Sequence, residues 1–303
     1  MNLLKDYDLN LKHRACVKEK SLITPAGTRE EVQHIVLEVL GNEPFDYTEG
    51  QTIGVIVPGP HEFGNPTHFR LYSISSGKKE FKDGRMLSIS VRRCFYIDDY
   101  SGEECKGVAS NYLCDLPLGA EITITGPYAG AFTLPKDPAA NLLMIGVGTG
   151  IAPFRSFVKT IYKKSARAKA QAKTEGKKSS SKAWKGKVRL FYGGKSGVEL
   201  LYMNDHVNDF TSYYDEDTFK AFAALSPRPA MNHPIALDRK IEENAAEVWE
   251  LLESPKTHVY LAGLDKMAPN LEKVFAKLAG SESAWQVKKE TMRSEGRWAE
   301  LFY

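Results

Sequence analysis

The sequence lacks several features that would each have indicated a definite class of protein. No apolar run among its 303 residues approaches the ~20 residues of a membrane-spanning helix, so we expect no integral membrane segment. There is no Cys-x-x-Cys pair, which argues against a zinc site or an iron–sulfur cluster built from local spacing. The cysteines are instead widely scattered, at Cys16, Cys94, Cys105 and Cys114. We therefore expect no metal site, and any redox centre has to be a bound organic cofactor.

A strong charge of either sign is also missing. The 41 basic and 38 acidic residues leave a net charge of +3, which is too small to indicate nucleic acid as a partner. The opening residues, MNLLKDYDLN, contain no basic stretch leading into an apolar segment. This argues against a secretory signal and makes a cytoplasmic location the default expectation.

The charge is unevenly distributed along the chain. From Lys159 to Lys187 the sequence is rich in Lys, Ser, Ala and Gly, and Glu175 is its only acidic residue. Such a run is typical of a solvated, mobile insertion, which we place at about 163–187. A docking surface for an acidic partner is the alternative interpretation.

The length favours two domains, because 303 residues are about twice a typical single domain. In the first part, Val32–Leu40 and Met86–Arg92 alternate apolar and polar residues, which predicts half-buried strands. Glycine and proline clusters separate further strand-like segments. These are Thr52–Val57, Arg70–Ser75 and Glu121–Thr125. Together they predict a small antiparallel barrel or sandwich.

After a boundary at Leu134–Ala140 the pattern changes to short apolar strands alternating with helical segments, which is typical of a parallel α/β sheet. The expected strands are Leu142–Ile145, Val188–Tyr192, Thr257–Ala262 and a last one at Trp298–Tyr303. Helical spacing of apolar residues predicts crossover helices at Glu242–Leu252 and Pro269–Leu278. We therefore expect one domain over residues 1–137 and a second over residues 138–303.

Two motifs carry the chemistry. The segment Gly146–Phe154, GVGTGIAPF, predicts a strand-to-helix turn whose glycines let a ligand approach the backbone and whose helix dipole favours a pyrophosphate. Its Gly-x-Gly-x-Gly spacing differs from the usual dinucleotide fingerprint, so a tight packing turn is the alternative. Upstream, in RLYSISS, strand periodicity places Arg70 and Tyr72 on one face. They could pair with a phosphate and cover an aromatic ring, with Ser73 pointing the other way or into a turn.

With these motifs the chain resembles the plant-type ferredoxin–NADP+ reductase family over nearly its whole length. The similar segments are RLYSISS, KGVASNYLCDL from Lys106, Gly126-Pro127, GTGIAPFRS from Gly148, Leu200-Leu201-Tyr202, Val248-Trp249-Glu250 and the terminal aromatic Tyr303. The resemblance implies a six-stranded antiparallel β-barrel that binds FAD, followed by an α/β domain whose five-stranded parallel sheet binds NADP.

The resemblance also implies roles for individual residues. Arg70 would contact the FAD pyrophosphate, Tyr72 the isoalloxazine, and Ser73 would hydrogen-bond near flavin N5, where hydride is exchanged with nicotinamide. Tyr96 would stack on the FAD adenine, and Ser110 would help hold the flavin phosphate.

For the nicotinamide dinucleotide, the resemblance implies a further set of residues. Arg92 would lie near its phosphates, and the turn Gly148, Thr149 and Gly150 would bind it. The aromatic ring of Tyr303 would cover the flavin until nicotinamide displaces it.

Three departures limit this transfer. The family usually has a cysteine where Ala262 stands. Its last strand carries a carboxylate two places before the final aromatic, where this chain has Leu301. Glu300 lies one place earlier and so on the opposite face of a strand, which makes a proton-relay role for it no better founded than that of a solvent-facing carboxylate. Ser226 and Arg228 stand where the family recognises the 2′-phosphate, but Arg228 is displaced by one residue; Arg239 could complete such a clamp. NADP is favoured, and NAD stays an alternative.

The expected function is that of a FAD-dependent oxidoreductase that exchanges hydride with NADP(H) and single electrons with ferredoxin or flavodoxin, a separate acidic redox protein. One alternative is an NAD(P)H-dependent reductase component of an oxygenase or another multicomponent electron-transfer system. A non-enzymatic FAD-binding scaffold or redox sensor is the alternative from another class.

Overall fold

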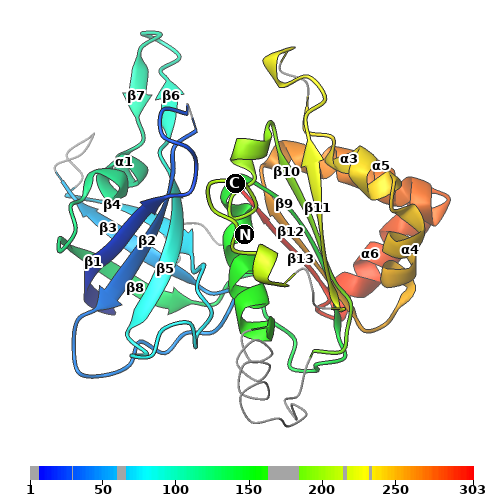
Figure 1. Ribbon diagram of the computed structural model, residues 1–303, viewed down its shortest axis with the longest axis horizontal. Coiled ribbons are helices and arrows are strands. Elements are labelled where there is room, and N and C mark those ends of the chain that lie inside the picture. Colours follow the sequence, from blue (N-terminus) through cyan, green and yellow to red (C-terminus); the bar gives the residue numbers. More distant parts are fainter. Residues whose placement is uncertain (1–6, 29, 60–65, 163–183, 214–216, 232–233) are drawn as a thin grey trace. The chain divides into compact units, whose positions relative to one another are not determined.

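The computed structural model forms two compact units, shown in Figure 1. The first comprises Met1–Thr133 with Arg155–Thr160, and the second comprises Leu134–Phe154 with Ile161–Tyr303. The structure describes residues 7–28, 30–59, 66–162, 184–213, 217–231 and 234–303. The expected basic insertion therefore lies outside the described residues except for its last four positions, 184–187.

The first unit is built on a six-stranded antiparallel sheet in the order β4-β3-β8-β1-β2-β5. Its strands are β1 (Lys12–Leu22), β2 (Val32–Val39), β3 (Thr52–Pro58), β4 (Thr67–Ser73), β5 (Met86–Arg92) and β8 (Glu121–Tyr128). A bridge between Ile74 and Ile89 joins the two edge strands, so the sheet closes on itself. This arrangement confirms the expected antiparallel barrel.

Alternation along these strands fills the inside of the barrel. Ile35 and Leu37 of β2 lie opposite Ile89 and Leu87 of β5, and all four side chains are fully buried. Burial of such residues on one face of paired strands fixes their register. A hairpin of β6 (Phe95–Ile97) and β7 (Glu104–Lys106) projects from this unit, and helix α1 (Val108–Asp115) follows it (Figure 1).

The second unit is built on a five-stranded sheet in the order β11-β10-β9-β12-β13, in which all neighbours are parallel. Its strands are β9 (Asn141–Val147), β10 (Val188–Gly194), β11 (Phe219–Leu225), β12 (Thr257–Gly263) and β13 (Trp298–Phe302). The chain builds outward from β9 to β11 and then returns to the other side of β9. In such sheets, ligands bind at the carboxyl ends of the strands where this reversal occurs.

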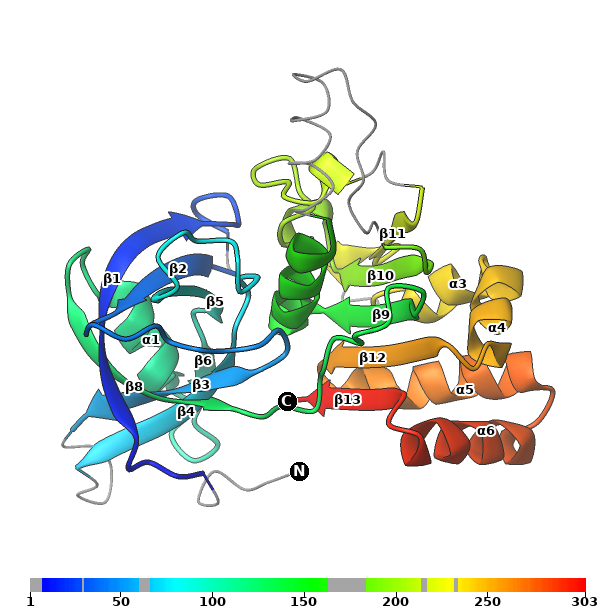
Figure 2. The same ribbon diagram turned by 90° about the horizontal axis from the view of Figure 1, so that it is seen from below.

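Four helices cover one face of this sheet (Figures 1 and 2). They are α3 (Leu237–Glu242), α4 (Ala245–Glu253), α5 (Ala268–Ala279) and α6 (Glu282–Ser294). Their apolar residues share one core with the strands, including Phe275 and Trp285. Helix α5 ends at Gly280 with φ of 84°, and Ser281 caps α6 by accepting the Ala284 N–H at 3.1 Å, so two helices follow each other closely.

Short helical turns and one longer helix complete the described residues. Residues 151–162 are helical. The turns are η3 (Gly148–Gly150), η4 (Gly197–Glu199), η5 (Thr211–Tyr213), η6 (Pro229–Met231) and η7 (Asp265–Met267). Among the helices described here, none is both long and apolar enough to cross a membrane. The described ranges also hold no group of three or more His, Cys, Asp or Glu side chains placed to bind a metal ion.

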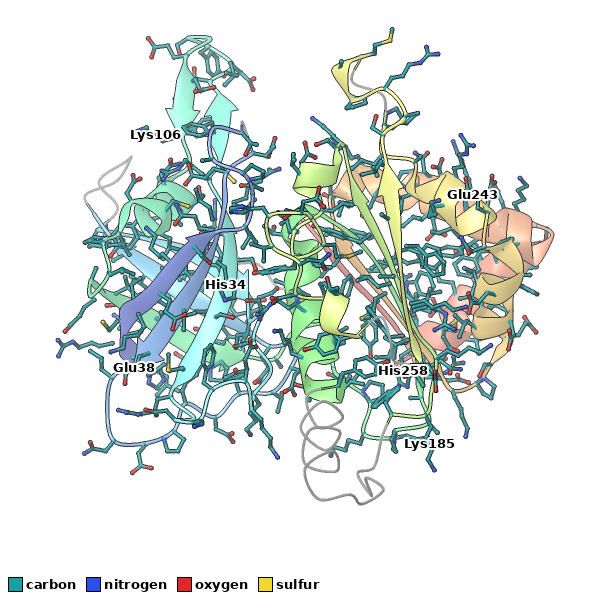
Figure 3. The ribbon with its side chains drawn as sticks, viewed as in Figure 1. His34, Glu38, Lys106, Lys185, Glu243 and His258 are labelled. Atoms are coloured by element: carbon teal, nitrogen blue, oxygen red, sulfur yellow. The ribbon has the colours of Figure 1, made fainter. Side chains whose placement is uncertain are left out.

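The expected helix at Glu242–Leu252 is wrong in its first turn. Helix α3 ends at Glu242, and α4 starts anew at Ala245. Glu243 lies at this break (Figure 3), where the Asn244 side chain donates to the Lys240 carbonyl at 2.9 Å. An asparagine that bonds to the preceding turn competes with continued helix, which explains the interruption.

Candidate functional site

The glycine turn lies where β9 and β12 end side by side. Gly148 has φ of 55°, a left-handed conformation that favours glycine. A Cβ at Gly150 would lie 2.5 Å from the Ala262 carbonyl oxygen, and one at Gly146 would lie 3.0 Å from the same atom. The glycines are thus required by the packing of two strand ends. Helix 151–162 begins directly after this turn, so its first amides follow the glycines.

Tyr303 lies against this turn. Its hydroxyl shares a hydrogen bond of 2.9 Å with Thr149 Oγ1, and its backbone N–H donates to the Gly263 carbonyl at 3.0 Å. The structure thereby brings together two predicted site residues that are 154 positions apart. The Tyr303 side chain is still 52% exposed, so a ligand can reach the ring.

Tyr192 holds the same turn through a hydrogen bond. Its hydroxyl donates to the Gly148 carbonyl at 2.7 Å. Burial, aided by the neighbouring Tyr303, raises the pKa of Tyr192 well above its ordinary value, so the phenol keeps the proton it donates. No sequence motif marked Tyr192, because it stands in a wholly buried strand where an aromatic is typical of a core residue.

Ser226 and Arg228 follow β11 at the same carboxyl edge of the sheet. Ser226 is buried, and its N–H donates to the Gly194 carbonyl at the end of β10 at 3.2 Å. Arg228 is exposed. Since neighbouring strands lie about 4.8 Å apart, β11 runs about 10 Å from β9, with β10 between them. An extended dinucleotide can span such a distance along one sheet edge.

Glu300 is held by side chains around β13 and α6. Its carboxylate accepts hydrogen bonds from Arg293 Nη2 at 2.6 Å and Trp298 Nε1 at 2.7 Å, and Lys289 Nζ lies at 2.9 Å. Burial raises the pKa of Glu300, but the bonds from Lys289 and Trp298 outweigh it and leave the pKa below its ordinary value. The expected relay role remains a prediction, to which these contacts lend no support.

In the first unit, Arg70, Tyr72 and Ser73 end strand β4. The Arg70 side chain is exposed, and neither it nor the Ser73 hydroxyl has a hydrogen-bond or ion-pair partner within the described ranges. Tyr72 packs partly against the barrel core, and burial raises the pKa of its phenol. The end of β4 therefore presents a neutral aromatic that is partly packed on the core, together with a cation and a hydroxyl that bond to no other described residue.

Helix α1 packs against β3, β4 and β5. Its N-terminus has no side-chain cap and no acidic residue in the first turn, so its amides and dipole suit an anion. The Ser110 hydroxyl accepts the Cys94 N–H at 3.1 Å, and Asn111 donates to the carbonyls of Cys94 and Gly107 at 2.8 Å each. These bonds fix the helix start to the end of β5. Asn111 was not among the predicted site residues, although it lies within the KGVASNYLCDL segment that resembles the family.

Two further predicted residues of the first unit lie nearby in the chain. Arg92 ends β5 and pairs with Glu30 at 3.3 Å. Tyr96 lies on β6 and is 50% exposed, on the hairpin whose other strand ends at Lys106, labelled in Figure 3. A half-exposed aromatic on a projecting hairpin can offer a flat face to a planar ring.

Known proteins similar to this chain were found by sequence and by structure. The family model of the oxidoreductase NAD-binding domain matches residues 144–273. A ferredoxin–NADP reductase of Spirulina sp. is 33% identical over 288 residues, covering 93% of this chain and 92% of the relative. A reductase of the same name from Synechocystis sp. is 34% identical over 286 residues, and the chain spans 65% of its length.

Plant and parasite proteins are also similar. The chloroplastic leaf isozyme 1 of ferredoxin–NADP reductase from Oryza sativa subsp. indica is 35% identical over 280 residues, covering 91% of this chain and 72% of the relative. The solved structure of a ferredoxin–NADP+ reductase from Plasmodium falciparum covers 98% of both chains with a TM-score of 0.69 at 19% identity. That likeness shows a shared two-unit fold.

Proposed function

The chain belongs to the ferredoxin–NADP reductase family, and on that premise we propose that it is a FAD-dependent oxidoreductase exchanging hydride with NADP(H) and single electrons with ferredoxin. The observation that carries the proposal is the meeting of Thr149 and Tyr303 at the carboxyl edge of the parallel sheet. A core tyrosine would be buried, whereas this ring is half exposed beside the glycine turn.

The residues of the first unit fit FAD. Arg70 is an unpaired guanidinium among the described residues, and the uncapped start of α1 offers backbone amides, so both suit the pyrophosphate. Tyr72 gives a neutral aromatic face for the flavin ring, and Tyr96 gives one for the adenine. We assign the hydroxyl of Ser73 to the flavin edge, where a small donor can orient the ring without crowding it.

The residues of the second unit fit a nicotinamide dinucleotide. Gly148, with its left-handed φ, and Gly150, packed against Ala262, carry no side chains in front of their backbone amides, as a pyrophosphate requires. Arg228 is exposed and Ser226 lies in the same loop, which suits a 2′-phosphate and favours NADP over NAD. Arg92 of the first unit, which the resemblance places near the phosphates of this ligand, stays a prediction.

When bound, FAD supplies the conversion between a two-electron hydride step and two one-electron steps. The chain's residues supply orientation and access. Tyr303 has to leave its bond with Thr149 before nicotinamide can take the place of its ring, and it returns afterwards to exclude water. Ser73 holds or releases a proton at the flavin edge as the ring changes charge. We assign Glu300 no step in the reaction and test its role separately.

The electron partner is proposed to be ferredoxin, as the names of the relatives state for those proteins. Flavodoxin is a second candidate of the same chemical class, an acidic protein that accepts single electrons. In the sequence, the basic run from Lys159 to Lys187 has the charge that such a partner needs. A cytoplasmic location stays a prediction, which none of the described residues tests.

The proposal is tested by mixing the FAD-loaded protein anaerobically with NADPH and oxidised ferredoxin, and by following the ferredoxin spectrum. We expect ferredoxin to be reduced catalytically, with a KM that rises with salt because charged surfaces steer the encounter. A parallel assay with flavodoxin ranks the two partners. Flavin reduction by NADPH without electron transfer to either protein would contradict the partner and favour the reductase component of another system.

A further inference from the structure

A group of charged and aromatic side chains joins α6 to β13. Lys289 is only 8% exposed, and a buried ammonium is costly unless it is paired. Its Nζ contacts Glu272 on α5 and Glu300 on β13, and it lies 5.2 Å from the centre of the Trp298 ring. The charge of Lys289 is thus shared between a neighbouring helix and the last strand.

Glu300 receives the hydrogen bonds and ion pairs of this group that reach β13, and the Trp298 ring receives the Lys289 ammonium. Three donors hold its two oxygens: Lys289 and Trp298 bind Oε1, and Arg293 binds Oε2. Two of the donors belong to α6, which runs beside β13 in Figure 2. Removing the carboxylate would leave a buried lysine with one partner fewer, so this contact is costly to break.

The strand that carries Glu300 is otherwise held by its pairing with β12 and by the packing of Trp298 against Phe275 and Trp285. Within the described sheet, β13 is an edge strand that pairs only with β12, from Val259 opposite Trp298 to Gly263 opposite Phe302. The ends of edge strands open more easily than the centre of a sheet. Beyond Phe302, the pairing with β12 continues through the hydrogen bond that the Tyr303 N–H donates to the Gly263 carbonyl.

Tyr303 stands three residues after Glu300, a distance of about 10 Å along an extended strand. The Tyr303 hydroxyl also shares a hydrogen bond with Thr149 Oγ1. Both bonds depend on where β13 places its end. The contacts that hold β13, those of Glu300 with α6 among them, therefore bear on how firmly Tyr303 stays at the glycine turn.

We propose that Glu300 is a positioning residue: through Lys289 and Arg293, helix α6 anchors β13 and thereby sets how readily the Tyr303 ring leaves Thr149 to admit the nucleotide. This inference rests on the proposed function, in which nicotinamide takes the place of that ring. A ligand that binds only the open form has an apparent affinity reduced by the fraction of open molecules. Loosening the anchor therefore tightens nucleotide binding.

The sign of this effect separates three roles. Loss of a proton relay would lower turnover and leave the Kd for NADP+ unchanged. General damage to the sheet would weaken NADP+ binding. Loss of an anchor strengthens NADP+ binding, by about threefold to tenfold if the open fraction rises by that factor.

The test measures the Kd for NADP+ by calorimetry on the FAD-loaded protein, for Glu300→Gln alone and combined with Tyr303→Ser. We expect Glu300→Gln to lower the Kd in the parent protein and to have no effect in the Tyr303→Ser background. Lys288→Met is the matched control, because the neighbouring lysine on α6 pairs with Glu253 instead. Arg293→Gln, which removes an exposed donor, is the milder variant should Glu300→Gln fail to fold.

A second measurement needs no nucleotide. Amide hydrogen exchange of residues 301–303 should accelerate about tenfold in Glu300→Gln and stay unchanged in Lys288→Met. An unchanged Kd and unchanged exchange, or an equal shift of Kd in both Tyr303 backgrounds, would overturn the anchoring role. Either result leaves the proposed function standing, which fails separately if the parent protein binds no NADP+.

Discussion

The two units prepare their candidate sites in different ways. In the second unit the site is made by contacts within the protein: the Ala262 carbonyl leaves no room for a side chain at Gly150, Tyr192 bonds to Gly148, and Tyr303 bonds to Thr149. In the first unit the side chains of Arg70 and Ser73 make no polar contact with other described residues.

This difference separates stability from binding. Where the fold itself requires a site residue, its replacement should both destabilise the protein and weaken ligand binding. Where a side chain makes no contact within the fold, its replacement should weaken ligand binding alone. The following substitutions are ordered from the largest expected effect to the smallest, and each can break or sharpen this contrast.

Ser73→Ala should lower the rate of flavin reduction by NADPH by about 100-fold, because a positioned proton donor or acceptor contributes at least about that factor. Rapid mixing followed by flavin absorbance gives the rate. The melting temperature should not change, since the hydroxyl has no partner within the described residues. Thr67→Ala, at the exposed start of the same strand, is the control. A rate equal to that of the control would remove Ser73 from the reaction.

Arg70→Gln should weaken FAD binding by about 1.5–3 kcal/mol, the range for hydrogen bonds to charged groups. Equilibrium titration of the flavin-free protein with FAD measures this. The free energy of unfolding of the flavin-free protein should stay within about 0.5 kcal/mol, as for other surface substitutions. If Arg70→Gln destabilised the flavin-free protein instead, the first site would depend on the fold as the second one does.

Gly150→Ala should lower the free energy of unfolding by about 1–3 kcal/mol, because overpacking forces strand ends apart. Its Cβ would lie 2.5 Å from the Ala262 carbonyl oxygen, whereas a Cβ at Gly197 meets nothing within 4 Å. Gly197→Ala is therefore the matched control. Denaturant unfolding and NADP+ titration should change together in the first variant only. A stable Gly150→Ala protein that had lost NADP+ binding would contradict the coupling.

Arg228→Ala should reduce the preference for NADPH over NADH about fivefold, since an exposed ion pair contributes up to about 1 kcal/mol. The preference is measured as the ratio of kcat/KM values for the two nucleotides. Lys277→Ala, an exposed lysine on α5 that pairs with Glu242, should leave the ratio unchanged. An unchanged ratio in Arg228→Ala as well would show that the displaced arginine does not read the phosphate.

The sequence predicted those elements whose pattern is local. Met86–Arg92 alternates cleanly, and β5 has these bounds. The parallel strands are short apolar runs, as confirmed for β9, β10 and β12. Helix α6 was missed, because its sequence ESAWQVKKETMRS is mostly polar and one of its buried residues is Lys289. Only tertiary contacts with Glu272 and Glu300 make that burial possible.

The sites follow the same rule. Glycine and proline at 146–153 identify a turn by themselves, because conformation restricts which residues fit there. The support from Tyr192 and the contacts of Glu300 with α6 could not be predicted, since each depends on a partner far along the chain. The shift of Glu300 by one place showed only that it leaves the family position. Only the structure showed that Glu300 turns toward α6, where it contacts Lys289 and Arg293.

The central claim is that nicotinamide bound by the second unit passes hydride to a flavin bound by the first. Anaerobic mixing of the FAD-loaded protein with NADPH, and separately with NADH, tests this most directly. The account predicts that the yellow flavin is bleached by both and faster by NADPH. If neither nucleotide reduced the flavin, the claim would be contradicted.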